Sequence, residues 1–364
     1  MAKLENVLSK VLAKVSPSLR RQRRIIALAE KLSQRVEEVV QRRGLEVTVR
    51  VEGSVAKNTW LSEAPDIDIF MQVSPTVPRK AFGTVYLQIA REAMADAEQL
   101  ERFAEHPYLE ANFNGTRVNI VPCYRTEKGE WKSATDRTPF HTDYVKPLLD
   151  EKLCGEIRLL KQFMKGINVY GAEIKVGGFS GYLCELLILC YGSFVQFLEA
   201  SRNWKTRTVI DLEGHYVGRE QELQLIFEGS LVIVDPVDSG RNAASAVRKD
   251  RLDELSAASR AFLKKPSERF FYPHETMLLG PEELKQVIEN RGSHLIFLRL
   301  GRVETIPDIL WGQLYKSQRA LRNLVKQHDF KLIRDAVWSD EDSLNVFLLE
   351  MENRYLPLLE KHVG

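Results

Sequence analysis

The chain has 364 residues, and at roughly 100–200 residues per domain this length predicts two or three domains. Apolar residues make up 44% and charged residues 28%, which excludes disorder as the dominant state. Lys and Arg number 52 against 50 Asp and Glu, a formal net charge of +2. This balance argues weakly against a nucleic-acid partner, although an acidic cleft beside basic surfaces would give the same sum.

The cysteines and the hydropathy pattern indicate the compartment. Cys123, Cys154, Cys184 and Cys190 are spaced too irregularly for a CxxC or zinc-knuckle motif, so a reducing environment fits them best. No run of about 18 apolar residues is present, so we expect no membrane partner and a cytoplasmic location.

The first third of the chain mixes helices and strands. Apolar residues at helical spacing predict a basic amphipathic helix over residues 16–43, and alternating valines then predict a strand over residues 47–51. A second strand is expected at residues 66–70 and a helix over residues 82–102. Two further strands over residues 108–124 should form a hairpin that turns at Asn114-Gly115.

The remainder reads as two more regions. Residues 156–167 and the almost wholly apolar residues 179–198 predict two long helices, the second buried on all sides. Strands are expected at residues 294–300, 331–338 and 343–351, with a helix at 309–327. We therefore predict an α+β protein with three domains: residues 1–137, a mostly helical part at 138–250, and a small α+β domain at 251–364.

The most informative local pattern is Gly53-Ser54 followed, after eleven residues, by Asp66-Ile67-Asp68. Successive side chains of a strand point to opposite faces, so Asp66 and Asp68 share one face while Ile67 fills the other. Two carboxylates roughly 6–7 Å apart repel each other unless a cation lies between them, and Mg²⁺ prefers such oxygen ligands. A Gly-Ser turn can present backbone N–H groups to a phosphate.

Two aspartates on one strand are by themselves common on solvated surfaces. With a Gly-Ser turn at this spacing, the pattern resembles the signature of the polymerase-β-like nucleotidyltransferases: a hydrophobic residue, Gly, Gly or Ser, a loop of similar length, and Asp-x-Asp. This resemblance implies a nucleotidyltransferase head, with a mixed sheet and flanking helices, over residues 1–137.

Further motifs occur along nearly the whole chain: GSVAKNTWL (53–61), VPCY (121–124), DRTPFH (136–141), LLKQF with NVYGAE (159–173), GGFSGYLCELL (177–187), DPVDSGRN (235–242) and LWGQLYKSQRALRNL (310–324). Together they resemble the archaeal CCA-adding enzymes, which are class I tRNA nucleotidyltransferases. The resemblance implies template-independent addition of C, C and A to the 3′ end of tRNA from CTP and ATP. The tRNA 3′-hydroxyl would attack the α-phosphate, and pyrophosphate would leave.

The same resemblance implies the roles of individual residues. Asp66 and Asp68 match the family's first two catalytic carboxylates and would hold Mg²⁺. The residues that match the family's nucleotide-binding positions are Gly53, Ser54, Lys57, Thr138, His141, Lys161, Tyr170 and Arg241. Among them, Arg241 would present hydrogen-bond donors to the incoming base. Lys57 stands where the family more often has Arg, so it keeps the charge but loses the bidentate geometry.

Two departures from the family pattern affect the predicted activity. Asn119 occupies the position of the family's third carboxylate, so we expect impaired chemistry with nucleotide binding largely kept. The sequence leaves open whether this asparagine is natural or introduced, and whether Glu110 substitutes for the missing carboxylate. Relatives also continue beyond the residues that match positions 362–364, so we expect a shortened C-terminus.

Other functions remain open at this point. The chain could be another RNA terminal nucleotidyltransferase, adding part of CCA or acting like a poly(A) polymerase, or a catalytically idle tRNA-binding homologue. Four cations on the helix expected at residues 309–327 could contact the tRNA backbone, although a solvated cationic face explains them equally well: Lys316, Arg319, Arg322 and Lys326. The sequence is compatible with a monomer or a homodimer.

Overall fold

The computed structural model describes residues 2–63, 65–103, 105–204, 207–273 and 279–355. The contacts divide the chain into two units, Met1–Ala172 with Val176–Pro273, and Glu173–Lys175 with His274–Gly364. The boundaries expected near residues 137 and 250 stay predictions. The expected C-terminal shortening concerns residues outside the described ranges.

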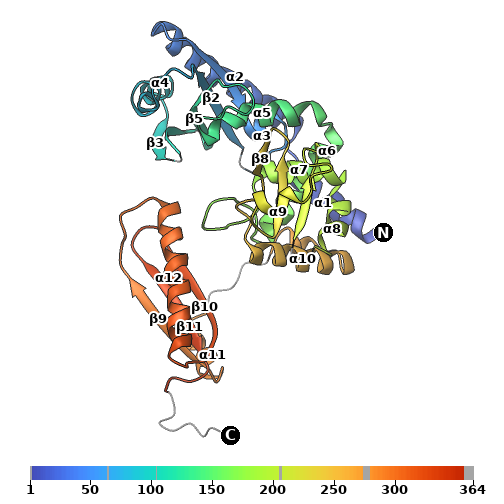
Figure 1. Ribbon diagram of the computed structural model, residues 1–364, viewed down its shortest axis with the longest axis vertical. Helices are drawn as coiled ribbons and strands as arrows, with labels where there is room; N and C mark the ends of the chain where they lie inside the picture. The colour runs from blue at the N-terminus through green and yellow to red at the C-terminus, as the bar shows by residue number, and fades with distance from the viewer. Residues whose placement is uncertain (1, 64, 104, 205–206, 274–278, 356–364) are drawn as a thin grey trace. The chain divides into compact units, whose positions relative to one another are not determined.

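The first unit begins with two helices that pack against different parts of it (Figure 1). The helix α1 (Ala2–Val15) packs against the later helix α6, whereas α2 (Leu19–Arg42) lies along the first sheet. Ser18 caps α2 by accepting a hydrogen bond from the backbone N–H of Arg21. The predicted helix over residues 16–43 is confirmed, with its start shifted to Leu19 by this cap.

The first sheet has five strands in the order β1-β2-β5-β4-β3. Their bounds are β1 Val47–Glu52, β2 Asp66–Val73, β3 Glu98–Phe103, β4 Pro107–Phe113 and β5 Thr116–Tyr124. The strands β2 and β5 are parallel, and the other pairs are antiparallel, which makes the sheet mixed. Asn114 and Gly115 both adopt positive φ, as a two-residue hairpin turn requires, so the predicted hairpin is confirmed.

The two faces of this sheet differ in chemistry. One face carries buried apolar residues such as Ile67, Ile69 and Ile120, which pack against α2 and α4 (Leu87–Ala93). The other face carries Asp66 and Asp68, because they alternate with the isoleucines along β2. The alternation predicted from the sequence is therefore confirmed.

The helix expected over residues 82–102 is wrong in its second half. A π-helical turn η2 (Phe82–Tyr86) leads into α4, which ends at Ala93, and residues 98–103 form β3. The residues in this stretch are good helix formers, but Glu98–Phe103 pair with β4 in an antiparallel ladder. Pairing between strands has overridden the local propensity.

The rest of the first unit is helical around a small second sheet. Its helices are α3 Gly53–Ala56, α5 Arg137–Val145, α6 Glu151–Gly166, α7 Gly181–Tyr191, α8 Phe194–Ser201, α9 Glu222–Ile226 and α10 Lys249–Lys264. The second sheet has the order β6-β7-β8, with β6 Thr208–Asp211, β7 Leu231–Asp235 and β8 Asp238–Asn242. Because α10 packs against α8, the first unit extends beyond residue 250.

The long apolar helix expected over residues 179–198 is in fact two helices. Gly192 takes a left-handed conformation that ends α7, and Ser193 caps α8 through its side chain, so the chain bends by 93°. In the described part of the chain, no single helix meets the length and hydropathy needed to cross a membrane; only this bent pair does so jointly.

The second unit is a small α+β domain, as predicted. A three-stranded antiparallel sheet has the order β10-β11-β9, with β9 His294–Leu300, β10 Leu332–Ser339 and β11 Asn345–Met351. Two helices accompany it, α11 (Pro281–Glu289) and α12 (Pro307–Gln327). Leu310, Trp311 and Leu314 of α12 pack with Phe347 of β11 in the core of this unit.

Candidate active site

The acidic end of β2 lies close to the turn at Gly53, which follows β1 in the chain. Gly53 has a φ of +72°, and a Cβ atom there would lie 2.2 Å from Oδ2 of Asp68. Only glycine therefore fits at this position while the Asp68 carboxylate keeps its place. The glycine of the predicted Gly-Ser pair is required by the carboxylate that it faces.

The two aspartates have raised pKa values. Burial raises the pKa of Asp68 to about 6, although a hydrogen bond from Asn119 opposes this shift. Burial also raises the pKa of Asp66, against the effect of Arg117, whose Nε lies 3.5 Å from Oδ1 of Asp66. Within the described ranges, Asp68 takes part in no ion pair. Among the residues that the structure describes, no basic group thus lies within ion-pair distance of its carboxylate.

Asn119 lies directly beside Asp68. The two residues are opposite each other in the parallel β2–β5 ladder, and Nδ2 of Asn119 donates to Oδ1 of Asp68 at 2.9 Å. An aspartate at position 119 would place a second carboxylate against Asp68 instead of a donor. At this position the asparagine makes an attractive hydrogen bond to Asp68, whereas an ionised aspartate would repel it.

The structure also places Glu110, whose position the sequence left open. Glu110 pairs with Asn119 across β4 and β5, so both side chains lie on the face that carries Asp68. Its carboxylate lies 3.1 Å from Arg102, and it lines a pocket of about 450 Å³ beside Asp66. Glu110 is thus on the correct face but already has a basic partner.

Another carboxylate beside Asp68 belongs to Glu52, which the sequence analysis missed. It occupies the hydrophobic position of the signature just before Gly53, and it lies opposite Asp68 in the β1–β2 ladder. The side chain is completely buried, and burial raises its pKa to about 7 although Nε of Arg50 lies 2.7 Å away. The sequence did contain a signal, because Glu52 is a charged residue at a position where the signature has an apolar one.

The loop that follows Ser54 is held by the helix α6. The buried Arg158 donates from Nε to the carbonyl of Trp60 at 3.0 Å and from Nη2 to the carbonyl of Asn58 at 2.6 Å. These bonds fix the segment that carries Lys57. Ser54 and Lys57 accordingly lie within and just after the short helix α3.

Lys57 and Lys161 meet at a buried carboxylate. Nζ of Lys57 lies 2.5 Å from Oε2 of Glu185, and Nζ of Lys161 lies 3.1 Å from Oε1. Thr59 donates to the same Oε1 at 2.5 Å. The lysines overcome the effect of burial and hold the pKa of Glu185 at about 2, so this carboxylate is ionised.

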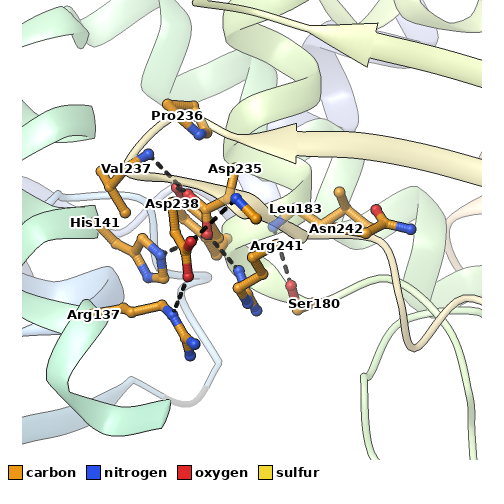
Figure 2. A network of polar contacts seen from close by, with 12 residues as sticks. Arg137, His141, Ser180, Leu183, Asp235, Pro236, Val237, Asp238, Arg241 and Asn242 are labelled. Atoms are coloured by element: carbon orange, nitrogen blue, oxygen red, sulfur yellow. Dashed lines mark hydrogen bonds and ion pairs between the residues drawn. The ribbon is translucent and has the colours of Figure 1, made fainter. Parts of the chain in front are cut away.

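His141 and Arg241 meet at a second buried carboxylate (Figure 2). Nε2 of His141 lies 2.9 Å from Oδ2 of Asp235, and Nη1 of Arg241 lies 2.5 Å from the same oxygen. Tyr182 joins the two clusters: its ring stacks on His141, its hydroxyl donates to Asp235, and Nζ of Lys57 lies 5.7 Å from its ring centre.

The remaining predicted residues lie nearby. Thr138 is one turn before His141 on α5. The Tyr170 hydroxyl and the Lys161 ammonium both approach Gly181, where a Cβ atom would lie 3.1 Å and 3.6 Å from them. The sequence missed Glu185, Asp235 and Tyr182, although a lone glutamate within the apolar helix α7 already implied a buried basic partner.

The residues on β2 fit a divalent cation. Two carboxylates with raised pKa values share one face, and Asp68 has no ion-pair partner within the described residues. In the described part of the chain, no group of three or more His, Cys, Asp and Glu side chains is placed to hold a metal, which agrees with an amide at position 119. The oxygen ligands that β2 and β5 would provide are the carboxylates of Asp66 and Asp68 and the amide oxygen of Asn119.

The mixed sheet, the Gly-Ser turn and the aspartates of β2 define a polymerase-β-like nucleotidyltransferase. Residues 32–141 match the nucleotidyltransferase domain family, residues 155–272 the second domain of tRNA nucleotidyltransferases, and residues 291–364 the C-terminal domain of CCA-adding enzymes. The chain is 38% identical over 357 residues to the CCA-adding enzyme of Methanosarcina barkeri, covering 97% of this chain and 77% of that one. The chain belongs to the family of CCA-adding enzymes, which are tRNA nucleotidyltransferases.

Other similar proteins agree with this assignment. The CCA-adding enzyme of Halobacterium salinarum is 36% identical over 359 residues, which cover 98% of this chain and 77% of that one. Among solved structures, a cytoplasmic RNA terminal U-transferase is similar with a TM-score of 0.57 and 14% identity, covering 76% of this chain and all of that one. The CdnC protein of E. coli MS115-1 with ATP has a TM-score of 0.54 and 17% identity, covering 73% and 94%. At such identities these structures support the fold alone.

Proposed function

We propose that the chain adds C, C and A to the 3′ end of tRNA from CTP and ATP without a nucleic-acid template. The observation that carries the proposal is a single constellation within one unit of the chain. The aspartates of β2 adjoin the Gly53 turn, whose lysine is linked through Tyr182 to His141 and Arg241. Family membership supports the choice of tRNA as the acceptor.

Mg²⁺ is the proposed cofactor, with Asp66 and Asp68 as its protein ligands. When bound, such an ion lowers the pKa of an attacking hydroxyl and stabilises charge on the triphosphate. The chain's own contribution is the fixed carboxylate position, because Gly53 admits Asp68 against its backbone and Asn119 donates to it. Burial raises the pKa of Asp68, and the positive charge of Lys57 opposes that rise, so this lysine favours the ionised carboxylate.

The nucleotide would be held by residues from three elements. Ser54 and Lys57 contact the triphosphate in this proposal, and Lys57 retains spare donors because, among the described residues, Glu185 is its one carboxylate partner. Thr138, His141 and Tyr170 hold the remaining phosphate oxygens and the sugar, with Lys161 beside them. Arg241 keeps 32% of its side chain exposed and presents its outer N–H groups to the base.

The amide at position 119 makes weak chemistry the expected state of this chain. An amide carries no charge and cannot take the proton of the tRNA 3′-hydroxyl. Glu110 lies on the same face, but its carboxylate is paired with Arg102 and would have to leave that partner. We therefore propose that nucleotide binding is kept while nucleotidyl transfer is slow.

The deciding experiment uses the unmodified chain and Asn119→Asp with tRNA that lacks its 3′ CCA. Each protein is incubated with labelled CTP, ATP, UTP or GTP and a Mg²⁺ salt. Incorporation of C and A, with none from UTP or GTP, supports the proposal. Incorporation of UMP as readily as CMP would instead assign a general terminal transferase.

Asn119 also supports one second candidate, a tRNA-binding homologue that no longer transfers nucleotides. That function predicts tight binding of the CCA-less tRNA with no incorporation by either protein. In both cases binding should weaken with salt, because phosphate contacts release counterions.

A further inference from the structure

Asp235 contacts two of the residues proposed to face the nucleotide, His141 and Arg241. Its carboxylate is completely buried and has protein partners on both oxygens (Figure 2). The oxygen Oδ1 accepts from the Tyr182 hydroxyl at 3.0 Å and from the backbone N–H of Val237 at 3.1 Å. The oxygen Oδ2 accepts from His141 and from Arg241. All four positions around the carboxylate are thus taken by donors.

The charge of Asp235 determines the proton position on His141. Despite burial, the bond from His141 and the nearby Arg241 hold the pKa of Asp235 at about 2, so the carboxylate accepts and cannot donate. Burial lowers the pKa of His141, which favours the neutral ring. A neutral ring that donates through Nε2 carries no proton on Nδ1, so Nδ1 is a hydrogen-bond acceptor.

The same carboxylate fixes the orientation of Arg241. It holds Nη1 at 2.5 Å, and the guanidinium is a rigid planar fork, so a bond at one nitrogen limits where the other donors point. His141 comes from α5, Tyr182 from α7 and Arg241 from β8. Asp235 therefore ties three separate elements to one position.

We propose that Asp235 is a positioning residue for nucleotide selection, which aims the guanidinium of Arg241 at the incoming base and sets the tautomer of His141. This inference rests on the proposed function of Arg241 as the base reader. It adds a consequence for the sugar side: in this tautomer Nδ1 of His141 suits a ribose hydroxyl, which can donate, and not an ionised phosphate oxygen, which only accepts.

Asparagine at position 235 would break this arrangement without changing its size. If the amide nitrogen took the place of Oδ2, it would face the donors of Arg241 and His141. If it took the place of Oδ1, it would face the backbone N–H of Val237. Either orientation turns at least one hydrogen bond into a contact between two donors.

The chain offers a matched control in the same hairpin. Asp238 lies 2.7 Å from Nε of Arg137, so it also joins β8 to α5 (Figure 2). The structure gives it no bond to His141 or Arg241. Asp238→Asn therefore removes an ion pair between the same two elements while leaving the proposed readers in place.

The functional test measures the ratio of kcat/KM for CTP to that for UTP, with CCA-less tRNA and Asn119→Asp as the parent. Asp235→Asn should lower this ratio by about ten- to a hundredfold, as expected for losing a hydrogen bond to a charged group. Asp238→Asn should leave the ratio within about twofold of the parent. An unchanged ratio in Asp235→Asn would overturn the inference, even if its overall rate fell.

A double mutant tests whether Asp235 acts through Arg241. If it does, adding Asp235→Asn to Arg241→Met should lower the CTP-to-UTP ratio no further than Arg241→Met alone. Effects of the two substitutions that multiply would contradict the proposed route. Thermal unfolding of each variant distinguishes a loss of selectivity caused by misfolding from one that occurs in a folded protein.

A spectroscopic readout keeps the inference testable if neither parent protein transfers nucleotides. In ¹⁵N-labelled protein, His141 should show an unprotonated Nδ1 and a protonated Nε2, and Asp235→Asn should change this pattern whereas Asp238→Asn should not. The opposite tautomer in the unmodified chain would refute the inference. Absence of CMP and AMP transfer with the expected tautomer would refute the proposed function alone.

Discussion

Two aspartates of the first unit, one on each of its two sheets, have pKa values shifted in opposite directions. Asp68, on the five-stranded sheet, has a pKa raised to about 6 by burial. Asp235, on the three-stranded sheet, is also buried, yet its pKa is lowered to about 2. The difference lies in the partners: one asparagine amide donates to Asp68, whereas four donors surround Asp235.

The two environments have opposite consequences for stability. Ionisation of Asp68 is disfavoured by folding, so its contribution falls as pH rises from its unfolded pKa near 3.8 to about 6. Asp235 contributes stability that is present above about 3.8 and is lost as pH falls toward 2. The paired carboxylate of Asp235 thus stabilises the fold when it is ionised, whereas ionisation of Asp68 costs stability.

The strongest test of this distinction adds a second carboxylate beside Asp68. Asn119→Asp should raise the single-turnover rate of CMP addition by about a hundredfold or more, because it restores a group that can accept the hydroxyl proton. Binding of CTP and ATP should change little, since Lys57, His141 and Arg241 are untouched. Quenched-flow incorporation into CCA-less tRNA measures the rate.

A control separates the added charge from the lost hydrogen bond. Asn119→Ala removes the donor to Asp68 without adding a carboxylate, so it should leave the rate near that of the unmodified chain. Without divalent ions, Asn119→Asp should unfold at a lower temperature than either, because two carboxylates then adjoin. Equal single-turnover rates for Asn119→Asp and the unmodified chain would show that position 119 does not limit the chemistry.

The next effect concerns a fully paired carboxylate. Glu185→Gln should lower the free energy of unfolding by about 3 kcal/mol, because it leaves the ammonium groups of Lys57 and Lys161 buried without their counter-charge. Urea denaturation measures the loss. The matched control is Asp253→Asn, whose exposed pair with Lys249 should contribute only about 0.3 kcal/mol. A similar loss in both variants would mean that Glu185 is not the hub that its contacts indicate.

The sequence predicted the acidic face better than the positioning network, for a physical reason. The positions of Asp66 and Asp68 follow from strand alternation, which is local, and the turn at Asn114-Gly115 follows from two residues that tolerate positive φ. The contact between Lys57 and Glu185 joins residues far apart in the chain, and no local rule predicts it. The motifs already contained Asp235, but its four partners come from the packing of separate elements.

The errors in secondary structure have the same origin. Residues 98–103 are locally suited to a helix, and only their pairing with β4 makes them a strand. The break between α7 and α8 is the opposite case, because Gly192 and Ser193 are local signals of a helix end and a new cap. The apolar composition of the stretch concealed them.

Glu52 tests whether a buried carboxylate that its basic neighbour stabilises too little lowers the stability of the nucleotidyltransferase head, residues 1–137. Its pKa is raised to about 7, so its ionisation costs about 2–3 kcal/mol of stability once the pH exceeds that value. Glu52→Gln should therefore raise the free energy of unfolding by about 2 kcal/mol near pH 8. Near pH 5 the gain should be small, because the carboxyl of the folded chain is already protonated there. Urea titrations at both pH values measure the difference; a gain that is larger at low pH would refute the assignment.

The smallest expected effect concerns the cations of α12, which also divide into side chains with an ion-pair partner and exposed ones. Arg322 makes a bidentate contact with Asp335, at 2.9 Å on both sides, whereas Lys316, Arg319 and Lys326 are exposed. If this helix contacts tRNA, replacing Lys316 or Arg319 with Ala should weaken tRNA binding by about threefold and reduce the salt slope by about one. Filter binding at several salt concentrations measures both quantities.

Arg322 is the internal control, because its charge already has a partner. Arg322→Ala should leave the salt slope of tRNA binding nearly unchanged while lowering the stability of the second unit, since Asp335 then loses its counter-charge. If Arg322→Ala reduced the salt slope as much as Lys316→Ala, a paired guanidinium would be serving the ligand as well as the fold. The presence of an ion-pair partner would then not distinguish structural charges from tRNA-binding charges on α12. The same argument, applied to Asp235 and Asp68, would lose its support.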